Sequence, residues 1–86
     1  MKIARNPLFV SEVLDGEICI FDPTNASYFN LNSTGSFIWR ALTKSKSRDE
    51  ILELLFKEYK IKLEDKREVL AFIDECIKNE IFIEKN

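Results

Sequence analysis

The stretch YFNLNSTGSFIW, residues 28–39, contains the position at which the chain changes from a strand to a helix. Up to Leu31 the side chains alternate in the way that is typical of a half-buried strand, which we place over residues 27–31. Beyond Leu31, either Asn32 or Ser33 can accept hydrogen bonds from the first free amides of a helix. The apolar residues that follow then fall at helical spacing; they are Phe37, Ile38, Ala41 and Leu42.

The residues before this stretch predict two more strands and two tight turns. Residues 8–14 (LFVSEVL) and 17–22 (EICIFD) are rich in β-forming residues. The Asp-Gly pair between them is the strongest short signal for a hairpin. Residues 23–27 form the second turn, in which Pro23 sets φ and Asn25 tolerates the left-handed backbone. With residues 27–31, these segments predict an antiparallel meander.

The residues after the stretch predict two further helices and a terminal segment. Ser47–Glu50 (SRDE) has the pattern of a capping box, and the helix behind it extends to Tyr59. Asp65 with Glu68 repeats this capping pattern before a third helix over residues 66–79. The final IFIEK segment is expected to be a short strand or a tail docked on the core. The sequence therefore predicts one α+β domain over residues 1–86, winged-helix-like, with a three-stranded antiparallel sheet followed by three helices.

The composition argues against catalysis. The 86 residues include no histidine, which removes the usual general base at neutral pH and the commonest metal ligand. Two cysteines, Cys19 and Cys76, cannot form a zinc site alone, and two glycines are too few for a phosphate-binding loop. We therefore expect no enzyme activity, no catalytic residue, no metal and no cofactor.

Charge and hydropathy give expectations about partners and location. A net charge of −2 with interspersed signs argues against nucleic acid and membrane surfaces as partners. No apolar run is long enough for a signal peptide or a membrane span, so we expect a cytoplasmic protein. Both cysteines stand in core-like patterns, and we expect them to be buried free thiols.

Residues 27–31 would form an edge strand with one unpaired side. The segment contains neither Lys nor Pro, which commonly protect such edges. In the predicted third helix, the apolar residues cover an arc of roughly 160°, wider than the ~100° that a core-facing stripe needs. The members of this arc are Val69, Leu70, Phe72, Ile73, Cys76 and Ile77. A groove at the margin formed by Phe72, Val69 and Cys76, beside an open strand, would suit a peptide that binds by strand addition.

Other interpretations stay open from the residues alone. The margin of the helix can pack under the terminal IFI segment, and a chain end or a second copy can cover the strand edge. A winged-helix DNA-binding protein is a further alternative, but residues 64–80 contain six acidic and three basic residues, which would repel phosphates. A purely structural accessory subunit of an enzyme is the third.

The quoted stretch resembles the signature of PqqD-like proteins, the RiPP recognition elements that assist the biosynthesis of ribosomally made peptide natural products. The residues that carry the resemblance are Tyr28-Phe29, Leu31-Asn32 and Ile38-Trp39, and the LN..G form is similar to stand-alone members associated with lasso peptides. ILELLFKEY (Ile51–Tyr59) and EVLAFIDECI (Glu68–Ile77) resemble the helical motifs of the family. Glu68 stands where the family commonly has Asp. The third helix ends in Asn79-Glu80 where the family often has Gly; Asn79 can adopt the left-handed cap, so we expect this change to be mild.

The resemblance implies that the leader segment of a precursor peptide binds as an added strand, antiparallel to residues 27–31, in a groove toward the third helix. The precursor would then pass to a leader peptidase, a radical-SAM enzyme or a cyclase. Tyr28 and Asn30 should border the leader, while Phe29 and Leu31 face the core. Backbone groups from Ser27 to Leu31 would bond the leader, four apolar side chains would line its pocket, and Arg67 or Glu68 would add a charge at the rim. The full predicted peptide-binding set is Ser27, Tyr28, Phe29, Asn30, Leu31, Arg67, Glu68, Val69, Phe72, Ile73 and Cys76.

Overall fold

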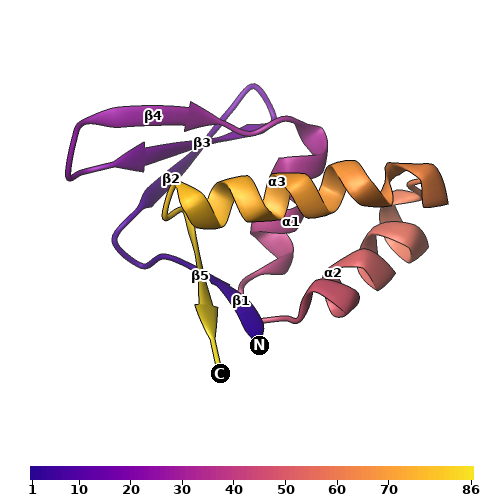
Figure 1. The fold of residues 1–86 in the computed structure, drawn as a ribbon. Helices are drawn as coiled ribbons and strands as arrows, with labels where there is room; N and C mark the ends of the chain where they lie inside the picture. Colours follow the sequence, from indigo (N-terminus) through magenta and orange to yellow (C-terminus); the bar gives the residue numbers. More distant parts are fainter.

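A computed structural model describes all of residues 1–86 and shows a small sheet followed by helices (Figure 1). Strands β2, β3 and β4 form an antiparallel sheet in that order, and three α-helices follow it. This arrangement confirms the predicted α+β, winged-helix-like fold. The elements are β1 (Lys2–Arg5), β2 (Val10–Leu14), β3 (Glu17–Asp22), β4 (Ser27–Asn30), α1 (Ser33–Ala41), α2 (Arg48–Leu54), the π-helix η1 (Leu55–Tyr59), the 3₁₀-helix η2 (Leu63–Asp65), α3 (Lys66–Lys78) and β5 (Phe82–Lys85).

The hairpin between β2 and β3 has the predicted turn. Asp15 and Gly16 both have positive φ angles, of 53° and 83°, as the turn that suits twisted strands requires. The strand β2 begins later than predicted because the Asn6 carbonyl and side chain accept bonds from the amides of Phe9 and Leu8, which holds residues 6–9 in a turn. The predicted strand over residues 8–14 therefore loses its first two positions.

In the turn between β3 and β4, the left-handed residue is not Asn25, which tolerates that backbone, but its neighbour. Ala26 has the left-handed backbone, with a φ of 58°. The Asn25 side chain instead accepts a bond of 3.1 Å from the Ser27 amide, so its oxygen stabilises the turn without a left-handed conformation.

A second, two-stranded sheet joins the two ends of the chain. Strand β1 pairs with β5 in antiparallel register, with Ala4 opposite Ile83 and Arg5 opposite Phe82. The other side of β1 bonds Lys46 through both backbone groups of Ile3. The terminal segment is thus both a strand and docked on the core, since Phe82 is only 1% exposed. Figure 1 shows the two chain ends side by side, away from β4.

The core lies between the helices and the inner face of the three-stranded sheet. Its aromatic centre consists of Trp39 and Phe82, whose ring centroids are 6.3 Å apart. Arg5 covers the Trp39 ring at 4.6 Å and donates to the Trp39 carbonyl at 2.8 Å, so β1 also holds the end of α1. Six of the ten elements each contribute one fully buried aliphatic residue; these are Ile3, Ile20, Ile38, Ile51, Leu55 and Ile73.

The first two α-helices begin as predicted. The Asn32 side chain caps α1 by accepting a bond of 2.8 Å from the Gly35 amide. Ser47 and Glu50 form the reciprocal capping box of α2. The prediction for Asp65 is wrong, because its backbone is already helical and its side chain caps no α3 amide. The Asp65 carboxylate instead accepts a bond from the Lys62 amide, one turn earlier, where η2 begins.

At the end of α3, Glu80 rather than Asn79 has the left-handed backbone. The φ angle is 64° at Glu80 and −87° at Asn79. The amides of Glu80 and Ile81 donate to the carbonyls of Ile77 and Cys76, which is the Schellman arrangement that usually has glycine at the left-handed position. The predicted cap exists, but it lies one residue later.

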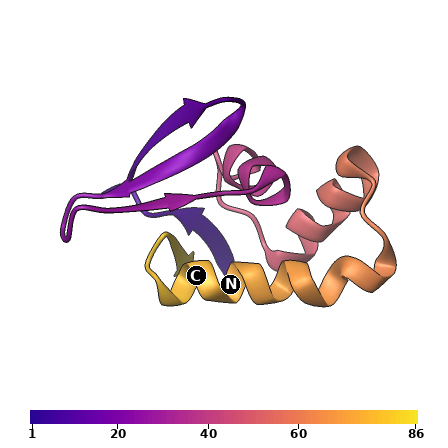
Figure 2. The same ribbon diagram turned by 90° about the horizontal axis from the view of Figure 1, so that it is seen from above.

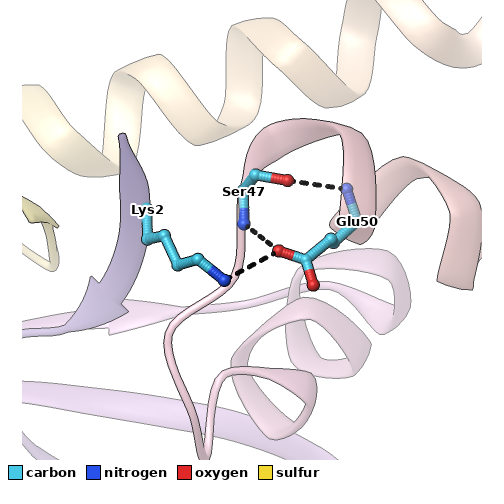
Figure 3. A network of polar contacts seen from close by, with 3 residues as sticks. All are labelled: Lys2, Ser47 and Glu50. Atoms are coloured by element: carbon cyan, nitrogen blue, oxygen red, sulfur yellow. Dashed lines mark hydrogen bonds and ion pairs between the residues drawn. The ribbon is translucent and has the colours of Figure 1, made fainter. Parts of the chain in front are cut away.

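Figure 3 shows how Glu50 links the start of α2 to β1. Its carboxylate accepts a bond of 2.9 Å from the Ser47 amide and lies 3.3 Å from the Lys2 ammonium group. These contacts, chiefly the bond from the Ser47 backbone, lower the pKa of the Glu50 carboxyl below its ordinary value of 4.5. The lowered pKa means that Glu50 contributes stability above pH 4.5, and that this contribution is lost as the pH falls through the folded-state pKa.

The variant Glu50→Gln should therefore lose less stability on acidification than the wild type. Glutamine keeps the capping-box bond but does not titrate. Urea unfolding of both proteins at pH 7 and at about pH 3.5, below the ordinary pKa of a carboxyl group, measures the difference. Equal losses in the two proteins would show that the Glu50 carboxylate has no special interaction in the folded state.

Both cysteines are free and buried, as predicted. Burial, with a smaller effect from Glu75, raises the pKa of the Cys76 thiol to about 12. No group of three or more His, Cys, Asp or Glu side chains is arranged to hold a metal ion. None of the helices has the length and apolar character that crossing a membrane would require.

Candidate functional site: an open strand edge beside a cleft

Strand β4 has a partner on one side only. The Leu31 amide, just beyond the strand, donates to the Ile18 carbonyl at 2.8 Å. In the same register Phe29 lies opposite Ile20 and Ser27 opposite Asp22. Antiparallel pairs alternate between hydrogen-bonded and non-bonded positions, so Ser27, Phe29 and Leu31 direct their backbone groups toward β3.

The intervening residues, Tyr28 and Asn30, direct their N–H and C=O groups away from β3. The open edge therefore offers four backbone groups rather than those of all residues from Ser27 to Leu31. The Tyr28 and Asn30 side chains are exposed, Phe29 packs partly against the core and Leu31 is buried, as the alternation predicted.

Ser36 explains how the chain turns so abruptly from β4 into α1. Its buried hydroxyl accepts a bond of 3.0 Å from the Ile18 amide and donates one of 3.2 Å to the Leu31 carbonyl. The hydroxyl thus connects the Ile18 amide to the Leu31 carbonyl, two groups that would bond each other directly in a regular ladder between β3 and β4. Together with the Asn32 cap, it fixes the start of α1 directly against the end of the sheet.

A cleft of about 410 Å³ opens where β4 ends, between the start of α1, the end of η1 and the first turns of α3. Figure 2 places β4 between the rest of its sheet and α3, so the open edge and the cleft belong to the same side of the molecule. The cleft has an apolar part formed by Val69, Phe72, Ile61 and Tyr59, and a charged rim. Its complete lining is Asn32, Thr34, Gly35, Tyr59, Lys60, Ile61, Asp65, Glu68, Val69 and Phe72.

The Phe72 ring connects this cleft to the core. Its edge packs against Phe82 of β5, with centroids 6.3 Å apart. Its tip lies against Gly35 so closely that a Cβ atom there would be 2.8 Å from the Phe72 Cζ. The margin of α3 therefore packs partly on the terminal segment, as one alternative held, and still lines the cleft.

The structure brings only part of the predicted helix residues to the cleft. Glu68, Val69 and Phe72 line it. Ile73 and Cys76 are buried in the core at 0% and 4% exposure and line no cavity, so the predicted margin reduces to Phe72 and the edge of Val69. Arg67 lies in a different shallow depression on the outer side of α3, with Leu70 and Asp74, and does not share the rim with Glu68.

The comparisons with known proteins agree with this geometry. The family described as Coenzyme PQQ synthesis protein D (PqqD) matches residues 17–81. The chain belongs to the PqqD family. The matched region includes β3, β4 and all three helices of this PqqD-family protein, so it includes both the open edge and the cleft.

Two solved structures are similar to this PqqD-family protein over nearly its whole length. One is TbiB1 in complex with the TbiA(beta) leader peptide, with a TM-score of 0.81 and 24% identity, covering 96% of this chain and 98% of that one. The other is lasso peptide synthetase B1 complexed with the leader peptide, with a TM-score of 0.80 and 20% identity, covering 98% and 100%. At these identities the likeness establishes a shared fold. None of the curated proteins compared with the chain matches it.

Seven cleft residues of this PqqD-family protein were absent from the predicted site: Asn32, Thr34, Gly35, Tyr59, Lys60, Ile61 and Asp65. Gly35 had a signal, because it is the glycine of the LN..G pattern and lies under the Phe72 ring. Tyr59 had one too, as the last residue of the ILELLFKEY motif. Lys60 and Ile61 had none, since their positions depend on a π-helix that ends at a left-handed Lys60 with a φ of 57°. Such π-helical turns are rare and often occur at functional sites.

Gly35→Ala should destabilise the protein, although alanine favours a helix over glycine by about 1 kcal/mol. The added methyl group must displace a ring held by Phe82, and overpacking of this kind costs roughly 1–3 kcal/mol. Urea unfolding of Gly35→Ala, Phe72→Leu and the double variant forms a double-mutant cycle, in which Phe72→Leu should reduce the cost of the alanine. A Gly35→Ala protein more stable than the wild type would show that the ring moves aside freely.

Proposed function

We propose that this PqqD-family protein binds the leader segment of a ribosomally made precursor peptide as an added strand, antiparallel to β4, and delivers it to a modifying enzyme without catalysing a reaction itself. The observation that carries this proposal is the vacant side of β4 next to a cleft. Backbone bonds at a strand edge supply affinity and neighbouring pockets supply selectivity. The two similar structures are complexes with leader peptides, which supports the same role here.

The leader would bond the outward N–H and C=O groups of Tyr28 and Asn30. An antiparallel leader has its N-terminal end near Leu31, so residues that precede the paired segment reach the cleft. One large apolar leader side chain against Val69 and Phe72 would contribute about 1.5–3 kcal/mol. Glu68 would meet a charge at the rim, where exposure to solvent makes an ion pair weak.

The remaining predicted residues support the site rather than contact the leader. Ser27, Phe29 and Leu31 hold β4 to β3, and Ile73 and Cys76 support Phe72 and Val69 from the core. Arg67 faces another part of the surface and has no part in this proposal.

The partner enzyme would be a leader peptidase, a radical-SAM enzyme or a cyclase, and the complex would form in the cytoplasm. The likeness to a lasso peptide synthetase B1 favours a peptidase and a cyclase of lasso-peptide type. A short precursor gene beside genes for a peptidase and an asparagine-synthetase-like cyclase would support this assignment.

A binding experiment tests the proposal. Where the gene neighbourhood encodes a short precursor peptide, its fluorescein-labelled N-terminal half is the probe, titrated with the protein and followed by anisotropy. We expect saturable binding that unlabelled leader displaces and a scrambled peptide does not.

Two parallel measurements test the alternatives. A labelled DNA duplex at low salt should not bind, because the α3 region is acidic. Binding of the duplex without binding of the leader would favour the DNA-binding alternative. Tight association with an enzyme that the leader leaves unchanged would favour a structural subunit.

A further inference from the structure

A row of apolar side chains crosses the outer face of the three-stranded sheet. The register places Val10 opposite Phe21 and Phe21 opposite Tyr28, so the three side chains share one face. The alternate residues of β3 and β4, such as Ile20 and Phe29, face the core, so this row lies on the opposite, outer side. The Phe21 and Tyr28 rings contact each other, with centroids 4.8 Å apart and planes at 51°.

The row ends at the open edge with Tyr28, whose aromatic ring is only partly covered by other side chains. Tyr28 is 68% exposed, although Phe21 covers one side of its ring. A depression of about 160 Å³ lies along the row, lined by Val10, Glu12, Cys19, Phe21 and Tyr28. The neighbouring row, by contrast, has Glu12 opposite Cys19 and Cys19 opposite Asn30, and it is polar at both ends.

A strand added to β4 would extend each row by one residue. The guest residue opposite Tyr28 would lie with its Cβ about 5 Å from that of Tyr28, on the outer face, within reach of the uncovered side of the ring. The guest residue opposite Asn30 would lie in a polar row that already contains a carboxylate. The single guest residue between these positions would point to the other face, toward α3, and the residues that precede the paired segment would reach the cleft.

We infer that Tyr28 determines specificity, by selecting a guest peptide with an apolar or aromatic side chain on the outer face opposite Tyr28 and a polar side chain opposite Asn30. This inference rests on the proposed strand addition and adds a requirement to it. The peptide is then recognised on both faces, through the row on the outside and through the cleft on the inside. A peptide with the correct cleft side chain but a charged residue opposite Tyr28 binds less well.

A displayed library of random peptides, about nine residues long to span an added strand, tests the inference without a known leader. The library is selected in parallel on the wild type, on Tyr28→Lys and on Leu14→Lys. Tyr28→Lys should fold normally because the side chain is largely exposed. Leu14 is a matched control, since it is 56% exposed on the same outer face but lies in β2, at the far edge of the sheet.

We expect wild-type binders to have an apolar or aromatic residue at one outward position, a polar residue two positions before it, and apolar residues at the positions that face the cleft. On Tyr28→Lys, one outward position should change from apolar to Asp or Glu, while the set that faces the cleft stays apolar. Leu14→Lys should select the same sequences as the wild type. A peptide selected on the wild type should bind Tyr28→Lys about three- to tenfold more weakly, which is the range expected for loss of one aromatic contact.

The other outcomes each contradict a defined part of the account. Identical selections on the wild type and Tyr28→Lys would overturn the role of Tyr28 and leave strand addition intact. Failure of the wild type to select any alternating sequence would overturn both. If the wild type sediments as a dimer and Tyr28→Lys as a monomer, a second copy covers the row and the inference is wrong.

Discussion

Replacement of Asn30 by proline is expected to weaken leader binding more than tenfold without unfolding the protein. Proline removes the outward N–H of Asn30, and its ring occupies space that the guest backbone needs. The lost hydrogen bond alone is worth about 0.5–1.5 kcal/mol, and the obstruction adds to this cost by disturbing the neighbouring bonds. The fold should persist, because proline is tolerated in an edge strand where the N–H faces solvent.

Asn30→Ala is the matched control for this variant. It removes the same side chain but keeps the backbone amide, so its leader affinity should stay within about threefold of the wild type, as expected for a weak exposed contact. Anisotropy with the labelled leader measures both affinities, and circular dichroism checks the fold. Equal losses in the two variants would show that the Asn30 side chain, and not the strand edge, binds the peptide.

The largest loss of stability is expected for Phe82→Ala. Phe82 is 1% exposed and packs against Trp39 and Phe72, so its truncation removes contacts between β5, α1 and α3. Changes of a buried phenylalanine to alanine cost about 3–5 kcal/mol, a large part of the 5–15 kcal/mol that stabilises a typical domain. Urea unfolding at neutral pH measures the change.

Ile83→Ala, the next residue in β5, provides the comparison for Phe82→Ala. Ile83 is partly exposed and points to the other side of the strand, so its truncation should cost much less. If Phe82→Ala costs less than Ile83→Ala, the terminal segment is not docked on the core as described. A detached segment would then be free to approach the open edge of β4.

The elements that sequence patterns predicted correctly are those with local signals. The Asp-Gly turn fixed the hairpin, and Asn32 and the Ser47–Glu50 box marked the starts of α1 and α2. Strand β1 had no such signal, because its four residues contain only two apolar side chains, Ile3 and Ala4. They form a strand only because they pair with β5 on one side and with Lys46 on the other. That pairing joins positions some eighty residues apart, and local propensity contains no information about it.

The candidate site was predictable in part for the same reason. Alternation along residues 27–31 correctly separated the exposed Tyr28 and Asn30 from the inward Phe29 and Leu31. The margin of α3 at Phe72 was identified correctly, but Arg67 was wrongly grouped with Glu68. Consecutive helical residues lie about 100° apart, so a helical wheel already places Arg67 beside Leu70 and Glu68 beside Phe72. The wall from Tyr59 to Ile61 depends on the unpredicted π-helix.

Amide hydrogen exchange on the ¹⁵N-labelled protein, with and without leader, tests the central claim most directly. The Tyr28 and Asn30 amides should exchange quickly in the free protein and become protected when the leader binds. The Phe29 and Leu31 amides, which already donate to β3, should be protected in both states. If the leader binds while the Tyr28 and Asn30 amides continue to exchange quickly, the peptide is not added to β4 and the proposed mode of recognition is wrong.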